Sequence, residues 1–235
     1  MVKFLKDGVE VDSVALLKIE AARARYMMSL LMRKLGPKGM SEIFADEIAA
    51  HAADEMKWHK QSNGKLAGSV AHADVAEGSA QDFIDWFWAG YGGPNVPAML
   101  RSHPEHLGGI PQPDGRLVVF EVPGHSRNPA HLYLRPTKDW SGVPVPLDPQ
   151  MPHRIMARLE SREGELIGAI LHEFAEKSPG FKARFSVHWP AATPNELLRG
   201  HIDHLMIEWN NWIRMYLQTR SQNVDLMPIA LKCGL

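Results

Sequence analysis

His204 and Glu208 lie four residues apart in a long segment near the C-terminus, and their side chains are of types that bind metal ions. Positions i and i+4 share one face of a helix, so the imidazole and the carboxylate would project side by side. Neutral histidine and ionised glutamate are both zinc ligands. The alternative is a His–Glu contact on a helix surface, which needs no metal. The pair alone leaves both interpretations open.

The helix that would carry this pair is marked by its own sequence. Thr193 is the predicted cap, Pro194 suits the first helical position, and Glu196 stands where a capping box has its acid. Apolar residues at helical spacing form a stripe that includes the His204–Glu208 pair. We therefore expect one long amphipathic helix whose stripe consists of Leu198, Ile202, Leu205, Trp209 and Trp212.

Other residues in the sequence could join the pair. His103 and His106 lie in a predicted loop just before a strand-like segment, Arg116–Val122, and Glu121 lies inside that segment. Burying a carboxylate there without a partner would be costly, and a metal ion or an arginine would offset the cost. A strand that turned Glu121 to solvent would need neither, so both orientations stay open. His172 ends an apolar strand, where a lone histidine is more often structural than catalytic.

A competing metal signal lies in the N-terminal region. Glu47, His51, Glu55 and His59 are spaced by four along one predicted helix and form a polar stripe. Carboxylates and imidazoles at such spacing supply ligands in helical metal bundles. One helix cannot surround an ion, however, and the preceding helix offers only Glu20 as an acid and no histidine. We therefore predict that the stripe faces solvent or another subunit.

The elements that would position these residues fall into two groups. Helical spacing predicts a helix over residues 13–35, capped by Ser13 and ended by Gly36 and Pro37, then a second over residues 41–60 and a loop at residues 64–68. A short aromatic helix follows the capping box formed by Ser79 and Asp82. Five strand-like segments then precede the C-terminal helix: Arg116–Val122, His131–Arg135, His153–Glu160, Glu165–Phe174 and Phe181–Trp189.

Strands in succession followed by one long helix predict an α+β fold, in which a curved antiparallel sheet surrounds the C-terminal helix. We assign residues 1–75 to a helical N-terminal region and residues 76–235 to the domain that carries the candidate site.

Composition excludes several classes of protein. The 235 residues are 45% hydrophobic and 23% charged, with a net charge of −1, so no basic field exists to attract nucleic acid or an anionic membrane. Cys233 is the single cysteine and a weak nucleophile candidate, and neither a signal peptide nor a membrane-spanning segment is evident. These features predict a cytoplasmic protein. No phosphate-binding loop, dinucleotide-binding motif, serine-hydrolase elbow or C-x-x-C pair occurs.

Several segments, taken in order, resemble the family of 2,4-diacetylphloroglucinol hydrolase and phloretin hydrolase, whose members cleave a carbon–carbon bond between an acyl group and a phenolic ring. The resemblance runs from about Asp82 to Leu217. It depends on the order and spacing of segments that are not specific one by one. These segments are Asp82-Phe-Ile-Asp-Trp-Phe-Trp, His103-Pro-Glu-His, Val118-Val-Phe-Glu, Leu171-His-Glu-Phe, Ala183-Arg-Phe, Leu197-Leu-Arg and His204-x-x-x-Glu-Trp-Asn-Asn.

The resemblance implies a START-type helix-grip cavity with a zinc ion. The implied ligands are His106, Glu121, His204 and Glu208, with His103 as the alternative to His106 because the loop is one residue shorter than in the family.

The same resemblance implies a set of substrate contacts. His172 corresponds to a pocket histidine that contacts substrate in the family. Met99 and Phe185 would also line the substrate site, and they stand where the family has hydroxyl-bearing side chains. Their apolar character implies a substrate different from diacetylphloroglucinol.

Two imidazoles and two carboxylates suit Zn²⁺, and Fe²⁺ or Mn²⁺ would also fit. We therefore predict a metal-dependent hydrolase that acts on a small aromatic ketone or a β-diketone-like compound. Glu208 would act at the metal, and His172 would position the substrate or move a proton. Two alternatives remain: a helix-grip binding protein for a hydrophobic aromatic ligand, and a metal-dependent cyclase or lyase with a polyketide-like substrate. The sequence allows a monomer or a homodimer.

Overall fold

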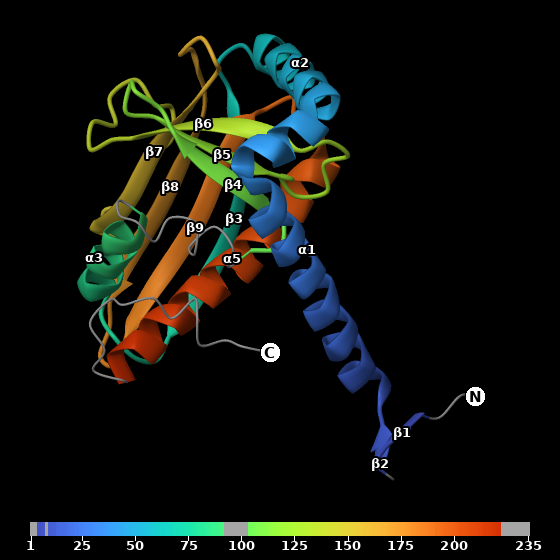
Figure 1. The fold of residues 1–235 in the computed structure, drawn as a ribbon. Coiled ribbons are helices and arrows are strands. Elements are labelled where there is room, and N and C mark those ends of the chain that lie inside the picture. Colours follow the sequence, from blue (N-terminus) through green and yellow to red (C-terminus); the bar gives the residue numbers. More distant parts are fainter. Residues whose placement is uncertain (1–3, 8, 92–102, 222–235) are drawn as a thin grey trace.

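The computed structural model describes residues 4–7, 9–91 and 103–221. A small hairpin, β1 (Phe4–Lys6) and β2 (Val9–Val11), precedes the 31-residue helix α1 (Ser13–Ile43). Figure 1 shows this hairpin and the first part of α1 extending away from a body that contains all the other elements. Among the described residues, no helix is both long and apolar enough to cross a membrane.

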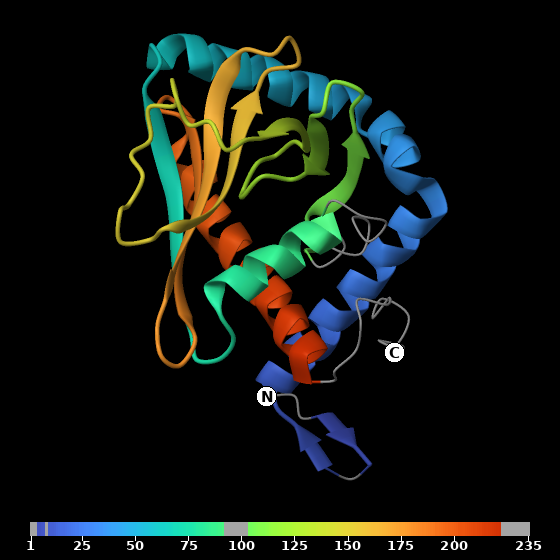
Figure 2. The same cartoon turned by 90° about the vertical axis from the view of Figure 1, so that its left-hand side faces the viewer.

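The body is built on one antiparallel sheet of seven strands in the order β3-β9-β8-β7-β6-β5-β4. The sheet is curved, with α3 (Ala80–Tyr91) and α5 (Asn195–Ser221) on its concave side and α2 (Ala45–Ser62) across one end (Figures 1 and 2). The predicted α+β class, with a sheet and a long C-terminal helix, is confirmed. The strands are β3 (Leu66–Val75), β4 (His106–Pro111), β5 (Leu117–Glu121), β6 (Ala130–Pro136), β7 (His153–Glu160), β8 (Leu166–Glu176) and β9 (Phe181–Pro190).

The main core lies between the concave face of the sheet and the two helices α3 and α5. Phe83 of α3 is fully buried and its ring contacts Phe174 and Phe181 from the sheet and Trp209 and Tyr216 from α5, with centroids 5.3 to 6.0 Å apart. Buried aromatic rings supply large apolar areas, so this cluster is a principal link between the helices and the sheet. The predicted cap of α3 is confirmed, because Ser79 Oγ accepts a hydrogen bond from the Asp82 amide at 3.1 Å.

The N-terminal helices differ from their predicted limits. Gly36 adopts a φ of 64° and Pro37 follows it, but the pair produces a kink and α1 continues to Ile43, so the predicted end at residue 35 is wrong. Glycine tolerates the left-handed conformation that lets the chain bend and resume its helix. The cap of α1 is Asp12, whose Oδ1 accepts from the Ala15 amide at 2.7 Å, and not Ser13.

The prediction of a helical region up to residue 75 is wrong for its last ten residues. Leu66–Val75 is the edge strand β3, which pairs with β9 along its whole length, so the sheet begins before residue 76. Helix α5 packs closely on this strand, and Ser69 Oγ donates a hydrogen bond to Leu198 O of α5 at 2.7 Å. The strand therefore consists largely of small residues, which lack the large apolar side chains by which a strand is recognised in a sequence. The predicted loop at residues 64–68 therefore runs into this strand.

The predicted exposed stripe on α2 is wrong for its two central members. His51 and Glu55 are only 3% and 7% exposed, whereas Glu47 is exposed and His59 is half-buried. The cause is the packing of α2 on the body. Ser126 Oγ donates to Asn128 O at 2.7 Å, so its 3.2 Å contact with His51 Nδ1 is a hydrogen bond donated by the imidazole.

Candidate metal centre

His106 and Glu121 are brought together by the pairing of β4 with β5. They are directly opposite residues in the antiparallel register, and a β-bulge follows at once, between His106 and Gly108. Opposite residues on one face of a sheet have neighbouring side chains, and a bulge redirects the side chains beside it. Glu121 is 5% exposed and points inward, so of the two orientations left open by the sequence the buried one is correct. Its Oε2 lies 3.2 Å from His106 Nε2.

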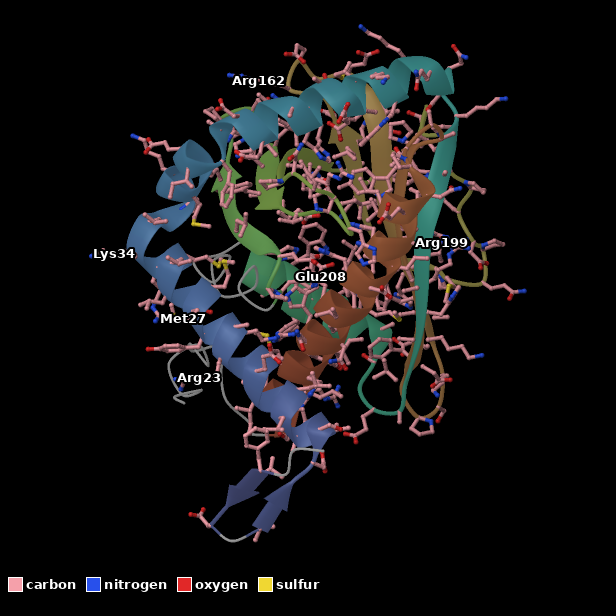
Figure 3. All side chains as sticks on the ribbon, turned by 90° about the vertical axis from the view of Figure 1, so that its right-hand side faces the viewer. Arg23, Met27, Lys34, Arg162, Arg199 and Glu208 are labelled. Carbon is pink, nitrogen blue, oxygen red and sulfur yellow. The ribbon has the colours of Figure 1, made fainter. Side chains whose placement is uncertain are left out.

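Helix α5 supplies His204 and Glu208 from the opposite side. Both are buried, and they lie one turn apart on the face that contacts the sheet. His106 Nε2 lies 3.2 Å from His204 Nε2 and 3.3 Å from Glu208 Oε1. His204 Nε2 lies 3.9 Å from Glu121 Oε2. Figure 3 shows Glu208 in the interior, between α5 and the sheet.

Three of these four separations are close to the distance between neighbouring ligand atoms around a zinc ion. Ligand atoms about 2.0–2.1 Å from a tetrahedral zinc ion are about 3.3 Å from one another. Three of the four measured separations are 3.2 or 3.3 Å, and the fourth is 3.9 Å. The donor atoms of His106, Glu121 and His204 therefore lie within 3.9 Å of one another, and Glu208 Oε1 lies 3.3 Å from His106 Nε2, so the cluster could hold a metal ion.

The charges of the cluster also favour a cation. Burial opposes ionisation of Glu121, but His204 and His106 outweigh it and hold the pKa of Glu121 well below its usual range. Burial raises the pKa of Glu208 to about 7. Although burial alone would lower it, the pKa of His204 rises to about 9 beside Glu121, Glu105 and Glu208. One proton on His204 compensates only part of the buried negative charge, whereas a divalent cation balances both carboxylates.

Glu105 orients the His204 ring from outside the cluster. Its Oε2 lies 2.7 Å from His204 Nδ1, which places the Nδ1 proton in that hydrogen bond and leaves Nε2 directed at the cluster. A carboxylate behind a histidine ligand fixes its tautomer and raises its basicity. Sequence reasoning did not assign Glu105 this role, although it separates the two histidines of the predicted loop.

The structure separates the roles of His103 and His106. His106 contacts both carboxylates, whereas His103 Nδ1 accepts a hydrogen bond from the Glu105 amide at 3.1 Å and its ring stacks on His204. His103 still belongs to the cluster, because donor atoms of His103, His106 and His204 lie within 4.8 Å of one another. Burial lowers the pKa of His103 well below its usual range, so the imidazole is neutral.

His201 is a member of the cluster that sequence reasoning missed. Donor atoms of Glu121, His201 and His204 lie within 4.8 Å of one another, and the His201 ring stacks on His204 with centroids 4.8 Å apart. Burial lowers the pKa of His201 to about 3. The signal was present, because His201 precedes His204 by three residues and so shares the helix face of the predicted pair.

Two glycines hold α5 against the loop that follows β5. A Cβ atom at Gly200 of α5 would overlap the backbone nitrogen of His125, and one at Gly124 would lie 2.6 Å from Leu197 O. This close contact lies one residue from His201 and three residues from Glu121. The two backbones can therefore approach only without side chains, and their approach sets the distance between the strand ligand and the helix ligands.

An apolar cavity opens from the cluster. Its volume is about 80 Å³, well below the roughly 300–1,000 Å³ of typical small-molecule sites, so a ring-sized ligand would enter only with movement of the lining side chains. Strands β4 to β9 and helices α3 and α5 form its walls, largely from aliphatic and tryptophan side chains. Its ionisable lining residues are His106, Glu121, His172, His201, His204 and Glu208.

His172 presents a hydrogen-bond donor to this cavity. Its Nδ1 accepts from the buried Ser186 amide at 3.2 Å, so the proton of the neutral ring is on Nε2. Burial lowers the pKa of His172 to about 3, which keeps the ring neutral. Trp209 lies against His172 with centroids 4.4 Å apart, and its buried Nε1 has no hydrogen-bond partner within the described ranges.

Two other predicted substrate contacts fare differently. Phe185 does not line the cavity: it is 2% exposed and stacks on Trp209 with centroids 4.3 Å apart, so Trp209 separates it from the cavity. Met99 and Cys233 lie outside the described residues.

The prediction that Thr193 caps α5 is wrong. Its Oγ1 is buried without a hydrogen bond to any described residue, and α5 begins at Asn195.

Comparison with known proteins gives distant structural neighbours only. No protein-family model matches the chain, and no curated protein matches it. Protein Ms6760 from Mycobacterium smegmatis aligns over 70% of this chain and 98% of its own, with 13% identity and a TM-score of 0.35. A putative uncharacterized protein from Rhizobium leguminosarum aligns over 66% and 95%, with 14% identity and a TM-score of 0.32. Similarity at this level identifies no function.

Proposed function

We propose that the protein is a zinc-dependent hydrolase of helix-grip architecture that cleaves the carbon–carbon bond between an acyl group and an aromatic ring or a β-diketone-like carbon. The observation that supports this most directly is the cluster of two imidazoles and two carboxylates beside an apolar cavity, in which His106 Nε2 lies 3.2 to 3.3 Å from donor atoms of the other three residues. A carrier of apolar ligands would gain nothing from burying two carboxylates among imidazoles, because each buried charge costs stability.

His106, Glu121, His204 and Glu208 would hold the zinc ion. When bound, zinc would polarise the ketone carbonyl and lower the pKa of a water molecule at the site. Glu105 would keep His204 in the tautomer that directs Nε2 inward, through its 2.7 Å contact. Glu208 would also act at the metal, where the carboxylate oxygen that does not bind zinc would accept the proton that water loses.

His172 would act on the other end of the substrate. Its Nε2–H is a fixed donor, because the Ser186 amide occupies Nδ1, and it would bind an oxygen on the aromatic ring of the substrate. The apolar walls of the cavity would hold the ring and exclude bulk water. His172 is therefore a positioning group in this proposal and not a base, because its unprotonated nitrogen, Nδ1, already accepts the hydrogen bond from the Ser186 amide.

The leaving carbon limits the substrate. Attack of water on the acyl carbon expels a carbanion, which must be delocalised and then protonated. Hydroxyl groups ortho or para to the acyl group stabilise that carbanion through the keto tautomer of the ring, and a second carbonyl does the same in a β-diketone. We therefore expect aryl ketones with such hydroxyls, or β-diketones, to be cleaved, and apolar ketones without them to bind unchanged.

The test is a panel of aryl ketones and β-diketones assayed for the released carboxylic acid in water enriched in ¹⁸O. Hydrolysis places one ¹⁸O atom in the acid, and a chelator should abolish the release. Turnover that persists in chelator would contradict the proposal. Binding without turnover across the panel would favour the carrier, and a product formed without ¹⁸O would favour a cyclase or lyase. His172→Phe, which keeps the volume but removes the donor, should raise KM more than it lowers kcat.

A further inference from the structure

Helix α1 leaves an unusual amount of apolar surface in water. Met40 is its one fully buried residue among those described. Single exposed apolar side chains are normal, but monomeric proteins rarely expose contiguous apolar patches larger than a few hundred Å². Nine large apolar side chains of α1 are between 36% and 63% exposed: Val14, Leu17, Ile19, Tyr26, Met27, Leu30, Leu31, Leu35 and Ile43.

The contacts of α1 with its own body begin only in its second half. Met28 and Met40 pack on a small cluster that includes Leu107 and Phe120, and Pro37 lies against Gly108. Before Met28 no residue of α1 is buried, and Figure 1 shows that part of the helix extending beyond the body. Helices in proteins take most of their stability from packing, so this half of α1 requires a partner surface.

The exposed surface of α1 alternates apolar and basic groups. Arg23 lies one helical turn from Ile19 and from Met27, and Lys34 lies one turn from Leu30. Figure 3 shows Arg23, Met27 and Lys34 along the outer side of the helix. Among the described residues, the one ion pair within α1 joins Lys38 and Glu42.

The charge of α1 is opposite to that of the rest of the chain. The helix has six basic residues and two acidic ones, a net charge of +4. The whole chain has 26 basic and 27 acidic residues, so the remainder has 20 and 25, a net charge of −5. A partner for α1 must therefore be apolar and acidic at once, and the body of this same chain has an excess of acidic groups.

We propose that the protein forms a symmetric dimer in which α1 of each copy packs on the body of the other. Two α1 helices packed face to face would bring like charges together. A lipid bilayer would exclude Arg23 and Lys34, which lie within the apolar surface. When each α1 packs on the acidic body of the other copy, both helices obtain an apolar and acidic partner surface, and the two contacts are related by one two-fold axis. About half of each of nine large side chains amounts to an area near the roughly 800 Å² per partner of a stable interface.

The experiment measures the mass of the full chain in solution by light scattering and the dimer dissociation constant by sedimentation. Met27→Glu/Leu31→Glu should weaken the dimer at least tenfold, because it buries two carboxylates in each interface. Met27→Leu/Leu31→Met is the matched control, and it should leave the dissociation constant within about twofold. Circular dichroism checks that both variants remain helical.

Salt distinguishes the exchanged arrangement from the alternatives. If basic α1 contacts an acidic body, raising NaCl from about 50 to about 500 mM should weaken the dimer, because it screens the attraction. A dimer that tightens with salt would indicate α1 packed on α1 and would overturn the proposal. A monomer at concentrations of about 50 μM would also overturn it. So would a dimer that Met27→Glu/Leu31→Glu leaves unchanged, because its interface would then lie elsewhere.

Discussion

At the scale of single residues, the two carboxylates Glu121 and Glu208 decide the chemistry of the candidate metal centre. Each is at most 9% exposed, and neither is paired with an arginine or a lysine among the described contacts. Imidazoles are their partners instead, and an imidazole compensates a carboxylate only while it is protonated. A divalent cation removes this conflict, which is the physical reason to expect the site to bind metal tightly.

Removing one donor from α5 should therefore abolish metal binding without unfolding the protein. We expect His204→Ala and Glu208→Ala each to lower zinc affinity by more than about 100-fold, because each removes one of the four proposed ligands and even the loss of a group that only orients a ligand costs about 10- to 100-fold. Elemental analysis of the purified variants measures this loss, and circular dichroism measures the fold. His153→Ala is the control, since this half-buried histidine contacts Gln81 far from the cluster. Stoichiometric zinc in either α5 variant would count against the site.

Zinc affinity should also rise with pH over a defined range. His204 has a pKa of about 9 in the metal-free protein, so at neutral pH zinc must displace its proton. Apparent affinity should increase about tenfold per pH unit between about 7 and 9 and level off above that range. Below about 7, where Glu208 also takes up a proton, the dependence should be steeper. A competition titration with a fluorescent zinc chelator measures it.

Glu105→Gln provides the check on that titration. Glu105 is one of the groups that raise the pKa of His204, so its loss should move the plateau of zinc affinity to lower pH. The same variant should weaken zinc binding about 10- to 100-fold at high pH, because the ring loses its orienting partner. A titration indistinguishable from that of the wild-type protein would contradict the role assigned to Glu105.

Much of this cluster could be predicted from the sequence, and the rest depended on which strands pair and in which register, which a sequence alone does not show. The spacing of His204 and Glu208 predicted their common face, because helical periodicity is local. The orientation of Glu121 could not be predicted, because a strand reveals its buried face only when its neighbours are known. His106 was separated from His103 by the register of β4 on β5, which is a long-range contact.

At the scale of elements, the close packing of α5 on the loop after β5 sets the geometry of the site. Gly200→Ala would place a Cβ atom on the backbone nitrogen of His125, and neither backbone can move freely. We expect a loss of about 1–3 kcal/mol in the free energy of unfolding, although alanine normally stabilises a helix more than glycine does. We also expect weaker zinc binding, because α5 must shift away from Glu121.

The matched control for this substitution is Gly39→Ala in α1. Its Cβ would meet only the Leu35 side chain, with Leu35 Cβ at 3.2 Å, so it should change the free energy of unfolding much less than Gly200→Ala. Urea denaturation and zinc content, measured on both variants, separate an effect of close packing from a general effect of glycine replacement. Equal changes in both variants would contradict the structural role of Gly200.

The elements themselves were predicted unevenly, for reasons that lie in their surroundings. Five strands with large apolar residues were identified, whereas β4 was predicted as a loop, although His106 is its first residue. Strand β3 was also missed, because its small residues lie under α5 and Ser69 bonds to that helix. The break at Gly36 and Pro37 was read as the end of a helix, but Met40 is buried beyond it and packing extends α1. In both cases tertiary contacts outweigh the local preference.

At the scale of the whole molecule, α1 has two halves with different roles. The first half makes no core contact, whereas Met40 packs on Leu107 and Phe120, the direct neighbours of His106 and Glu121. The second half of α1 therefore supports the strand pair that carries two of the donors. The first half is free to serve an interface.

Two truncations separate these roles. A chain that begins at Met28 should keep its zinc content and its melting temperature, because none of the described residues that it loses is buried. A chain that begins at Phe44 also loses Met40 and Pro37, and burial of a methionine is worth about 2–5 kcal/mol. It should melt at a lower temperature and bind zinc more weakly, because β4 loses the helix that covers it. Calorimetry and elemental analysis of the two chains measure both effects. If the chain that begins at Met28 lost its zinc as completely as the shorter one, the first half of α1 would be part of the site and not of an interface.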